Sequence, residues 1–190
     1  LRHPERIAAI HGEYLLAGAD AVTTDTFRAD PRALGIGMGE VLRILDAAWR
    51  TALGAAGTAD RVWAGFGPPA PETPDGTDCA VPADAGRTIR DETARKIDRF
   101  LALGARRFLF ETFDDDALPL WACARIKEAC PEAVTLVSFA VSPDGTARSG
   151  RMGRDLYEAA CLCPHVDIVG FNCVSGPVHL LRFIRTLRAD

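Results

Sequence analysis

The sequence predicts an α/β fold and, within that class, a partial (β/α)8 TIM barrel. Helix-like segments alternate with short β-branched segments five times along the 190 residues, and a sixth helix-like segment closes the chain. That order implies parallel strands joined by right-handed crossovers. A weak internal repeat favours a barrel, because residues 15–19 lead to Asp25-Thr26-Phe27 as residues 101–105 lead to Glu111-Thr112-Phe113. No strand is followed by the G-x-G-x-x-G pattern of a dinucleotide-binding sheet.

A complete barrel of this type usually needs about 250 residues. Five strands in 190 residues therefore predict one domain, residues 1–190, that is incomplete at both ends. We expect the first strand of the barrel to precede Leu1 and the last two strands to follow Asp190. Further domains of the same protein are compatible with this expectation.

The elements follow from local patterns. Apolar residues at helical spacing predict helices over residues 3–16, 40–56, 87–103, 117–129, 154–161 and 177–187. Runs of β-branched and aromatic residues predict strands over residues 20–27, 61–67, 107–113, 134–141 and 166–173. Gly65 and Gly67 in the second strand imply a close approach of neighbouring backbone. Residues 28–39 and the proline-rich residues 68–86 are predicted to be loops.

Composition excludes several classes of function. The net charge of −4 and the pI of about 5.6 come without a basic stripe, so no nucleic-acid partner is expected. No apolar run approaches the ~20 residues of a membrane span, and the start of the chain lacks a signal-peptide core. Six scattered cysteines are more typical of a reducing compartment than of a disulfide scaffold, which favours the cytoplasm.

Chemistry in a barrel concentrates where the strands end, because their carboxyl ends share one mouth. The polar and small residues predicted there are Asp25, Gly65, Gly67, Glu111, Ser138, Asn172 and Cys173. Glu111 ends an apolar run, and a carboxylate buried there without a partner is costly, which favours a ligand-binding role. Asp25 could bind a ligand or cap the loop that follows its strand.

Cys173 has three interpretations from the residues alone: a metal ligand, a nucleophile, or a small buried side chain. The spacing of Cys161 and Cys163 could suggest a pair of metal ligands, but no second pair follows at the spacing of a zinc site. They also lie at a helix-to-strand turn, away from the mouth. No histidine falls at the carboxyl end of a strand, so no histidine base is expected there.

Four motifs in one order resemble the homocysteine S-methyltransferase family of zinc-dependent (β/α)8 barrels. They are His11-x-x-Tyr14-x-x-Ala17-Gly18-Ala19-Asp20, Thr23-Thr24-Asp25-Thr26-Phe27, Glu111-Thr112-Phe113 and Gly170-Phe171-Asn172-Cys173. The resemblance runs over nearly all of the chain. It implies an enzyme that transfers a methyl group from an unidentified donor to the thiol of homocysteine, giving methionine.

The resemblance also assigns roles to residues. It implies that Cys173 is one of three zinc ligands, the others being an adjacent cysteine pair beyond Asp190. It implies that Glu111 contacts the homocysteine amino group and that Asp25 and Asn172 lie near the substrate. With one thiolate of three, the 190 residues alone are expected to be inactive.

Two departures from the family pattern support an alternative. Asp25 stands where the family usually has asparagine, and the segment from Gly65 to Pro69 is one residue shorter than its counterpart on the methyl-donor side. The alternative is therefore a degenerate barrel module that binds homocysteine or metal without turnover.

Overall fold

The computed structural model describes residues 3–70 and 85–187. Its strands are β1 (Val22–Thr23), β2 (Val62–Phe66), β3 (Arg107–Phe113), β4 (Val134–Phe139) and β5 (Ile168–Phe171). Its helices are α1 (Pro4–Leu16), α2 (Pro31–Leu34), α3 (Met38–Ala56), the 3-10 helix η1 (Ala59–Arg61), α4 (Ala85–Ala102), α5 (Ala117–Ala129), α6 (Gly153–Leu162) and α7 (Pro177–Leu187).

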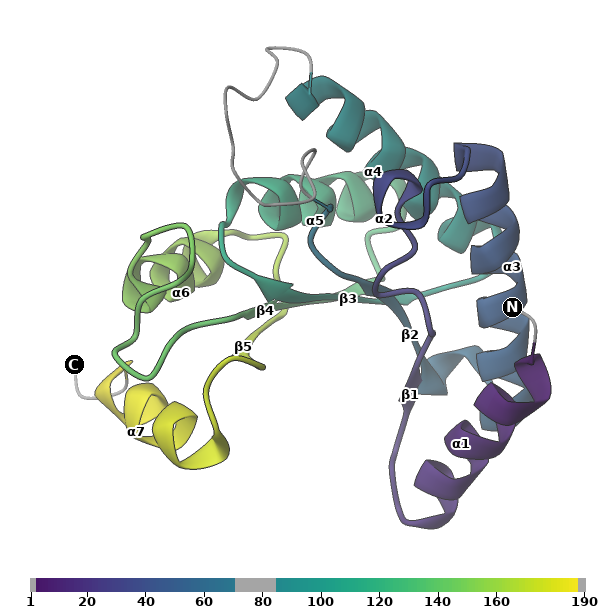
Figure 1. The fold of residues 1–190 in the computed structure, drawn as a ribbon, viewed down its shortest axis with the longest axis horizontal. Helices are drawn as coiled ribbons and strands as arrows, with labels where there is room; N and C mark the ends of the chain where they lie inside the picture. Colours follow the sequence, from purple (N-terminus) through teal and green to yellow (C-terminus); the bar gives the residue numbers. More distant parts are fainter. Residues whose placement is uncertain (1–2, 71–84, 188–190) are drawn as a thin grey trace.

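All five strands form one parallel sheet in the order β1-β2-β3-β4-β5 (Figure 1). Strand order thus follows chain order, whereas a doubly wound sheet reverses direction at a switch point. The prediction of a partial barrel is confirmed. Within the described ranges, no helix is both long enough and apolar enough to cross a membrane.

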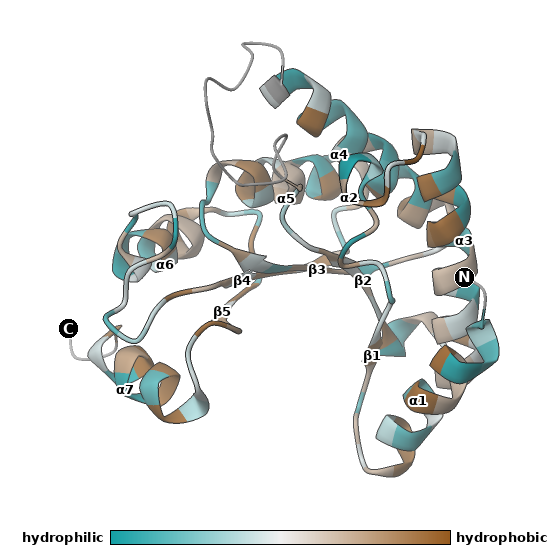
Figure 2. Cartoon of the chain, viewed as in Figure 1, coloured by the Kyte–Doolittle hydropathy of each residue, from teal (hydrophilic) through white to brown (hydrophobic). Residues whose placement is uncertain are grey.

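The sheet is arched, with α4 and α5 over its outer face and α1 and α7 at its two ends (Figure 1). Phe108 and Phe110 of β3 are buried, as the alternation of a strand requires, and Phe113, which follows a shift in register, is buried as well. Phe110 stacks on Phe66 at 4.9 Å between ring centroids, and Phe66 meets Phe100 of α4 edge-on at 5.6 Å. The side of α4 turned away from the sheet is largely hydrophilic (Figure 2).

The first strand is shorter than predicted. The Thr24 backbone N–H still donates to the Trp63 carbonyl at 2.9 Å, and beyond it threonine hydroxyls take the place of backbone partners. The Thr24 hydroxyl accepts from the Gly65 N–H at 2.9 Å, and the Thr26 hydroxyl donates to the Gly65 carbonyl at 2.7 Å. A Cβ on Gly65 would lie 2.7 Å from Thr23 Cγ2 and 3.3 Å from the Thr24 carbonyl oxygen, and a Cβ on Gly67 would lie 2.5 Å from the Phe27 carbonyl oxygen, so neighbouring backbone does approach both glycines closely. Side chains thus hold this end of the sheet together where β1 stops pairing.

The loop predicted over residues 28–39 contains the short helix α2. Asp30 caps it by accepting from the backbone N–H groups of Arg32 and Ala33 at 3.0 and 3.2 Å. The loop predicted over residues 68–86 falls mostly on residues 71–84, which lie outside the described residues.

Gly65→Ala should lower the free energy of unfolding by about 1–3 kcal/mol, because the new methyl group overlaps Thr23. Gly54→Ala is the matched control: Gly54 lies inside α3 with no heavy atom within 4 Å of an added Cβ. It should gain about 0.5–1 kcal/mol from helix propensity. Denaturant unfolding of both variants measures the difference, and equal effects would refute the close contact.

Candidate active site

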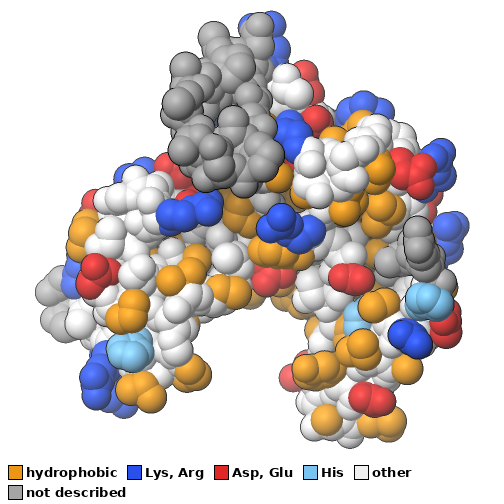
Figure 3. Space-filling view, in the orientation of Figure 1, with side chains coloured by type: hydrophobic (Ala, Val, Ile, Leu, Met, Phe, Trp, Pro, Cys, Tyr) orange, Lys and Arg blue, Asp and Glu red, His pale blue; other side chains and the backbone are white. Residues whose placement is uncertain are grey.

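The carboxyl ends of the five strands surround a cavity of about 440 Å³, here called the mouth pocket. Its lining includes Arg28 after β1, Pro69 after β2, Thr112 and Asp114 at the end of β3, Ser142 after β4 and Val174 after β5. The shared mouth predicted from the αβ alternation is therefore present. Figure 3 shows the molecule as an arch, hollow beneath the sheet between the parts that carry α1 and α7.

Asn172, the only asparagine in the sequence, connects three strands beside this pocket. Its Oδ1 accepts from the Thr112 backbone N–H at 3.0 Å and from the Ser138 hydroxyl at 2.8 Å. Its Nδ2 donates to the Thr112 hydroxyl at 2.9 Å, with longer contacts of 3.4 Å to Glu111 Oε2 and to Cys173 Sγ. The amide orientation follows from Thr112, because a backbone N–H can only donate.

The thiol cluster, Glu111, Thr112, Ser138, Asn172 and Cys173, owes its shape to a bulge in β3. Phe110 pairs with Val137, but Phe113 pairs with Phe139, so two residues of β3 lie opposite Ser138. Thr112 takes the left-handed region with φ of 66°, as do Cys173 at 58° and Val174 at 52°. Such backbone costs about 1–3 kcal/mol per residue and is concentrated at functional sites. The bulge turns Glu111 and Thr112 together toward β5.

Thr112 donates a hydrogen bond to Cys173. Because its oxygen accepts from Asn172 Nδ2, its own hydrogen is available to Cys173 Sγ, 3.4 Å away. Cys173 is exposed, so the interpretation of this residue as a small buried side chain does not hold. The thiol is instead presented to solvent, held by two donors.

Glu111 is a half-buried carboxylate that lacks a cationic partner. Burial raises the pKa of the Glu111 carboxyl. In the described part of the chain, no hydrogen bond or ion pair joins it to a basic side chain, and Asn172 is its one hydrogen-bond partner. A carboxylate in this state favours a cationic ligand, because a positive charge would offset the cost of its burial.

The structure does not bring Asp25 into the thiol cluster. Asp25 is exposed in the turn after β1, at the opposite edge of the sheet from β5. Its charge acts on His11 of α1, where burial is the larger effect and lowers the pKa of the imidazole. A substrate-binding role for Asp25 stays a prediction.

Phe66, which lies in the shortened segment from Gly65 to Pro69, belongs to the core. Phe66 is buried against Phe100 and Phe110 on the helix side of the sheet, and the mouth pocket is lined instead by Pro68, Pro69 and Ala70. The aromatic ring of Phe66 therefore does not line the mouth pocket.

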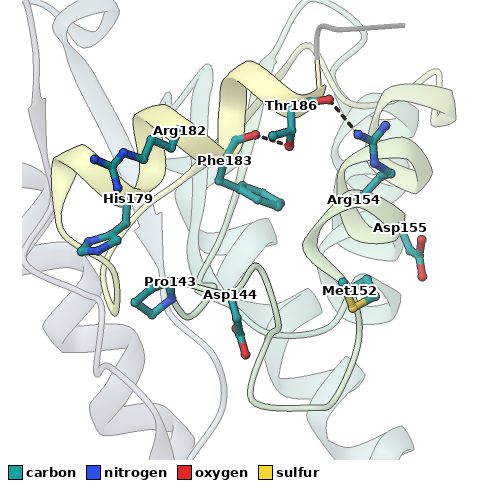
Figure 4. Close-up of a pocket in the computed structure, with 9 residues that line it drawn as sticks. All are labelled: Pro143, Asp144, Met152, Arg154, Asp155, His179, Arg182, Phe183 and Thr186. Carbon is teal, nitrogen blue, oxygen red and sulfur yellow. Dashed lines mark hydrogen bonds between the residues drawn. The ribbon is translucent and has the colours of Figure 1, made fainter.

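An aromatic side chain packs α7, the helix that follows Cys173, against the neighbouring loop. Phe183 points from α7 toward the loop between β4 and α6 (Figure 4), where an added Cβ on Gly145 or Gly153 would lie 2.9 or 2.8 Å from its ring. Arg154 adds a hydrogen bond of 2.7 Å to the Thr186 carbonyl. A cavity of about 490 Å³ remains beside this contact, outside the mouth.

Comparison with known proteins assigns the family. The model of the family described as "Homocysteine S-methyltransferase" matches residues 1–190. The chain belongs to this family. Betaine–homocysteine S-methyltransferase 1 of Danio rerio is 26% identical over 196 residues, which cover 98% of this chain and 45% of that protein. The chain thus spans about half the length of the curated relative it matches.

Solved structures support the fold. The homocysteine methyltransferase MmuM from Escherichia coli in its metallated form gives a TM-score of 0.74 at 22% identity, covering 98% of this chain and 70% of that one. Its apo form gives 0.71 at 21% identity, covering 98% and 69%. At these identities the likeness establishes a shared architecture.

The residues present supply one ligand of the kind that zinc prefers. Cys173 is an exposed thiol, but residues 3–70 and 85–187 contain no group of three His, Cys, Asp or Glu side chains that could hold a metal ion. One thiolate does not make a tight zinc site. The described residues therefore do not hold zinc by themselves, and a zinc centre needs ligands from elsewhere.

The sequence motifs predicted Glu111, Asn172 and Cys173 as site residues, and the structure brings these three together. No role was predicted for Thr112, although the sequence contains one indication of the bulge that places it. Phe108 and Phe110 keep a spacing of two, whereas Phe113 follows after three, and such a break in alternation marks a bulge.

Asn172→Ala should cost about 2 kcal/mol of unfolding free energy, because it leaves the Thr112 N–H and the Ser138 hydroxyl without a partner. Ser138→Ala and the double variant complete a thermodynamic cycle. We expect a coupling energy of at least about 0.5 kcal/mol. Strictly additive costs in denaturant unfolding would show that the amide does not join β4 to β3.

Proposed function

We propose that this chain forms the homocysteine-binding part of an enzyme that transfers a methyl group to the homocysteine thiol, giving methionine. Family membership supports the reaction class. The observation that carries the proposal is the juxtaposition of an unpaired carboxylate, Glu111, and an exposed thiol, Cys173, on one amide beside the mouth pocket.

The two ends of homocysteine match this arrangement. Its ammonium group would pair with the Glu111 carboxylate, which gains the cation that it lacks. Its thiol would then lie on the side of Cys173. Holding both ends fixes the direction of the sulfur, and such alignment can supply a large share of a rate enhancement.

Methyl transfer in this site is a displacement at carbon. A lone pair of the homocysteine sulfur forms the new S–C bond while the bond between the methyl carbon and the donor breaks. The electron pair of the broken bond stays with the donor. A free thiol resembling cysteine, with a pKa of about 8.5, is mostly protonated at neutral pH, so the sulfur must be deprotonated to react well.

Zinc is the cofactor we propose for that deprotonation. Bound zinc lowers the pKa of a coordinated thiol, and Cys173 would supply one of its thiolate ligands. The remaining ligands would come from cysteines outside the described residues. We further propose a cytoplasmic location, in keeping with the scattered free thiols.

The alternative, a binding module without turnover, rests on Asp25. Single-turnover methyl transfer in the full-length protein distinguishes the two, because a binding module would take up homocysteine and form no methionine.

Cys173→Ala should abolish stoichiometric zinc binding in the full-length protein. Cys161→Ala is the matched control, since Cys161 is also exposed but lies at the end of α6, away from the mouth. Zinc per chain, measured by atomic emission after dialysis, gives the result. Equal zinc contents in Cys173→Ala and the unmodified protein would refute the ligand assignment.

Glu111→Gln should weaken homocysteine binding by about 10- to 100-fold with zinc content unchanged, because the neutral amide cannot pair with the ammonium group. The ionised carboxylate is the binding form. Burial raises the pKa of Glu111, so binding to the unmodified protein should decline as pH falls through that raised pKa, at a higher pH than for an exposed carboxyl. Calorimetric titration tests this, and a pH profile shared by both proteins would contradict it.

A further inference from the structure

A hairpin that follows β4 forms part of the wall of the mouth pocket. This mouth hairpin, residues 142–152, is closed by the antiparallel pairing of Thr146 with Met152. Its Arg148 lines the pocket together with Asp114, the first residue after β3, and Arg148 Nε donates to Asp114 Oδ2 at 3.0 Å. The hairpin thus binds the loop that continues from β3.

That loop begins with three consecutive aspartates, Asp114, Asp115 and Asp116. Arg151 of the mouth hairpin donates from its two terminal nitrogens to Asp116 Oδ1 at 3.0 Å and to Asp116 Oδ2 at 3.2 Å, and it lies 3.8 Å from Asp115 Oδ2. A guanidinium group that binds both oxygens of a carboxylate fixes its geometry as well as its charge. Because only 16% of the Asp116 side chain is exposed, this carboxylate depends on the arginine as its partner.

Asp116 does not cap the helix that follows it. It occupies the N-cap position of α5, where an aspartate normally accepts from the first free backbone N–H groups and stabilises the helix. The Asp116 side chain makes no such bond, and Asp115 instead accepts from the Ala117 N–H at 2.8 Å. The Asp116 carboxylate is directed at Arg151, so it ties the loop after β3 to the mouth hairpin.

The position of this loop matters for Glu111, because pairing in the sheet does not hold that residue. The ladder between β2 and β3 ends at Phe66 and Phe110, and the ladder between β3 and β4 passes from Phe110 to Phe113 across the bulge. Among the described residues, Asn172 is the one hydrogen-bond partner of the Glu111 carboxylate, at 3.4 Å. The direction of this carboxylate therefore depends on where the chain after the bulge is fixed.

We propose that Arg151 is a positioning residue for Glu111. By holding Asp116, it fixes the loop after β3 and with it the direction of the carboxylate that binds the homocysteine ammonium group. This inference rests on the proposed function, because it takes Glu111 to bind that group. An ion pair whose arginine is 39% exposed contributes little to folding. The effect of Arg151 therefore lies in recognition of the ammonium group.

Two matched probes test this role in the full-length protein: homocysteine, and γ-mercaptobutyrate, which differs only in lacking the amino group. Isothermal titration should show that the unmodified protein prefers homocysteine. Arg151→Gln should weaken homocysteine binding about tenfold, because the misdirected carboxylate no longer meets the ammonium group. Binding of γ-mercaptobutyrate and the zinc content should not change.

Arg125→Gln is the matched control. Arg125 of α5 also binds both oxygens of an aspartate, Asp98 of α4, at 2.8 Å each, and its side chain is 38% exposed. This pair joins two helices and does not touch the loop after β3. Arg125→Gln should therefore keep the full preference for homocysteine.

Asp116→Asn completes a thermodynamic cycle with Arg151→Gln. Because the arginine acts through the aspartate, the double variant should bind homocysteine as weakly as either single variant, with no further loss. Additive losses would show that Arg151 acts on the substrate without Asp116, which overturns the positioning role.

Three other outcomes also overturn it: a full preference for homocysteine in Arg151→Gln, an equal loss in Arg125→Gln, or equal weakening of both probes. Failure of the proposed function is distinguishable through Glu111→Gln. If this variant loses the preference and Arg151→Gln keeps it, the positioning role alone fails. If the unmodified protein and Glu111→Gln share one preference, both proposals fail.

Discussion

The carboxamide of Asn172 is the interaction on which the site depends. An amide offers two acceptor positions and two donors, and here all are directed at protein groups on β3, β4 and the end of β5. The side chain thus joins three strands at the level where the sheet stops pairing regularly. Without it, the bulge of β3 and the left-handed turn at Cys173 would be two separate strained segments. With it, Glu111 and Cys173 keep a fixed relative position, which the proposed pose of homocysteine requires.

Much of the fold follows from local sequence signals. The bounds of β3 and α5 agree with the prediction, because the apolar run from Phe108 to Phe110 and the stop at Pro131 are strong signals. The short β1 could not be predicted, because it depends on the Thr24 and Thr26 hydroxyls meeting Gly65, some 40 residues away in the chain. The helix α2 was missed since Asp30, its cap, sits in a segment rich in glycine and proline.

The candidate site, like the fold, could be predicted from the sequence only where it depends on local signals. Residue type and strand-end position located Glu111, Asn172 and Cys173, but did not show that one amide connects them. That connection depends on the register between β3, β4 and β5, which long-range pairing sets.

The packing of Phe183 links the position of the Cys173 thiol to contacts on the outer surface of the molecule. Phe183 fits a slot that exists only because residues 145 and 153 lack side chains, and it also meets Phe171 at 5.0 Å between centroids. Between Phe171 and α7 runs the short segment that contains Cys173. Glu111, in contrast, is anchored in the middle of the sheet. A protein or ligand that displaced Phe183 from its slot would thus move Cys173 and leave Glu111 in place, so the distance between the thiol and the carboxylate can be changed from a point well outside the mouth.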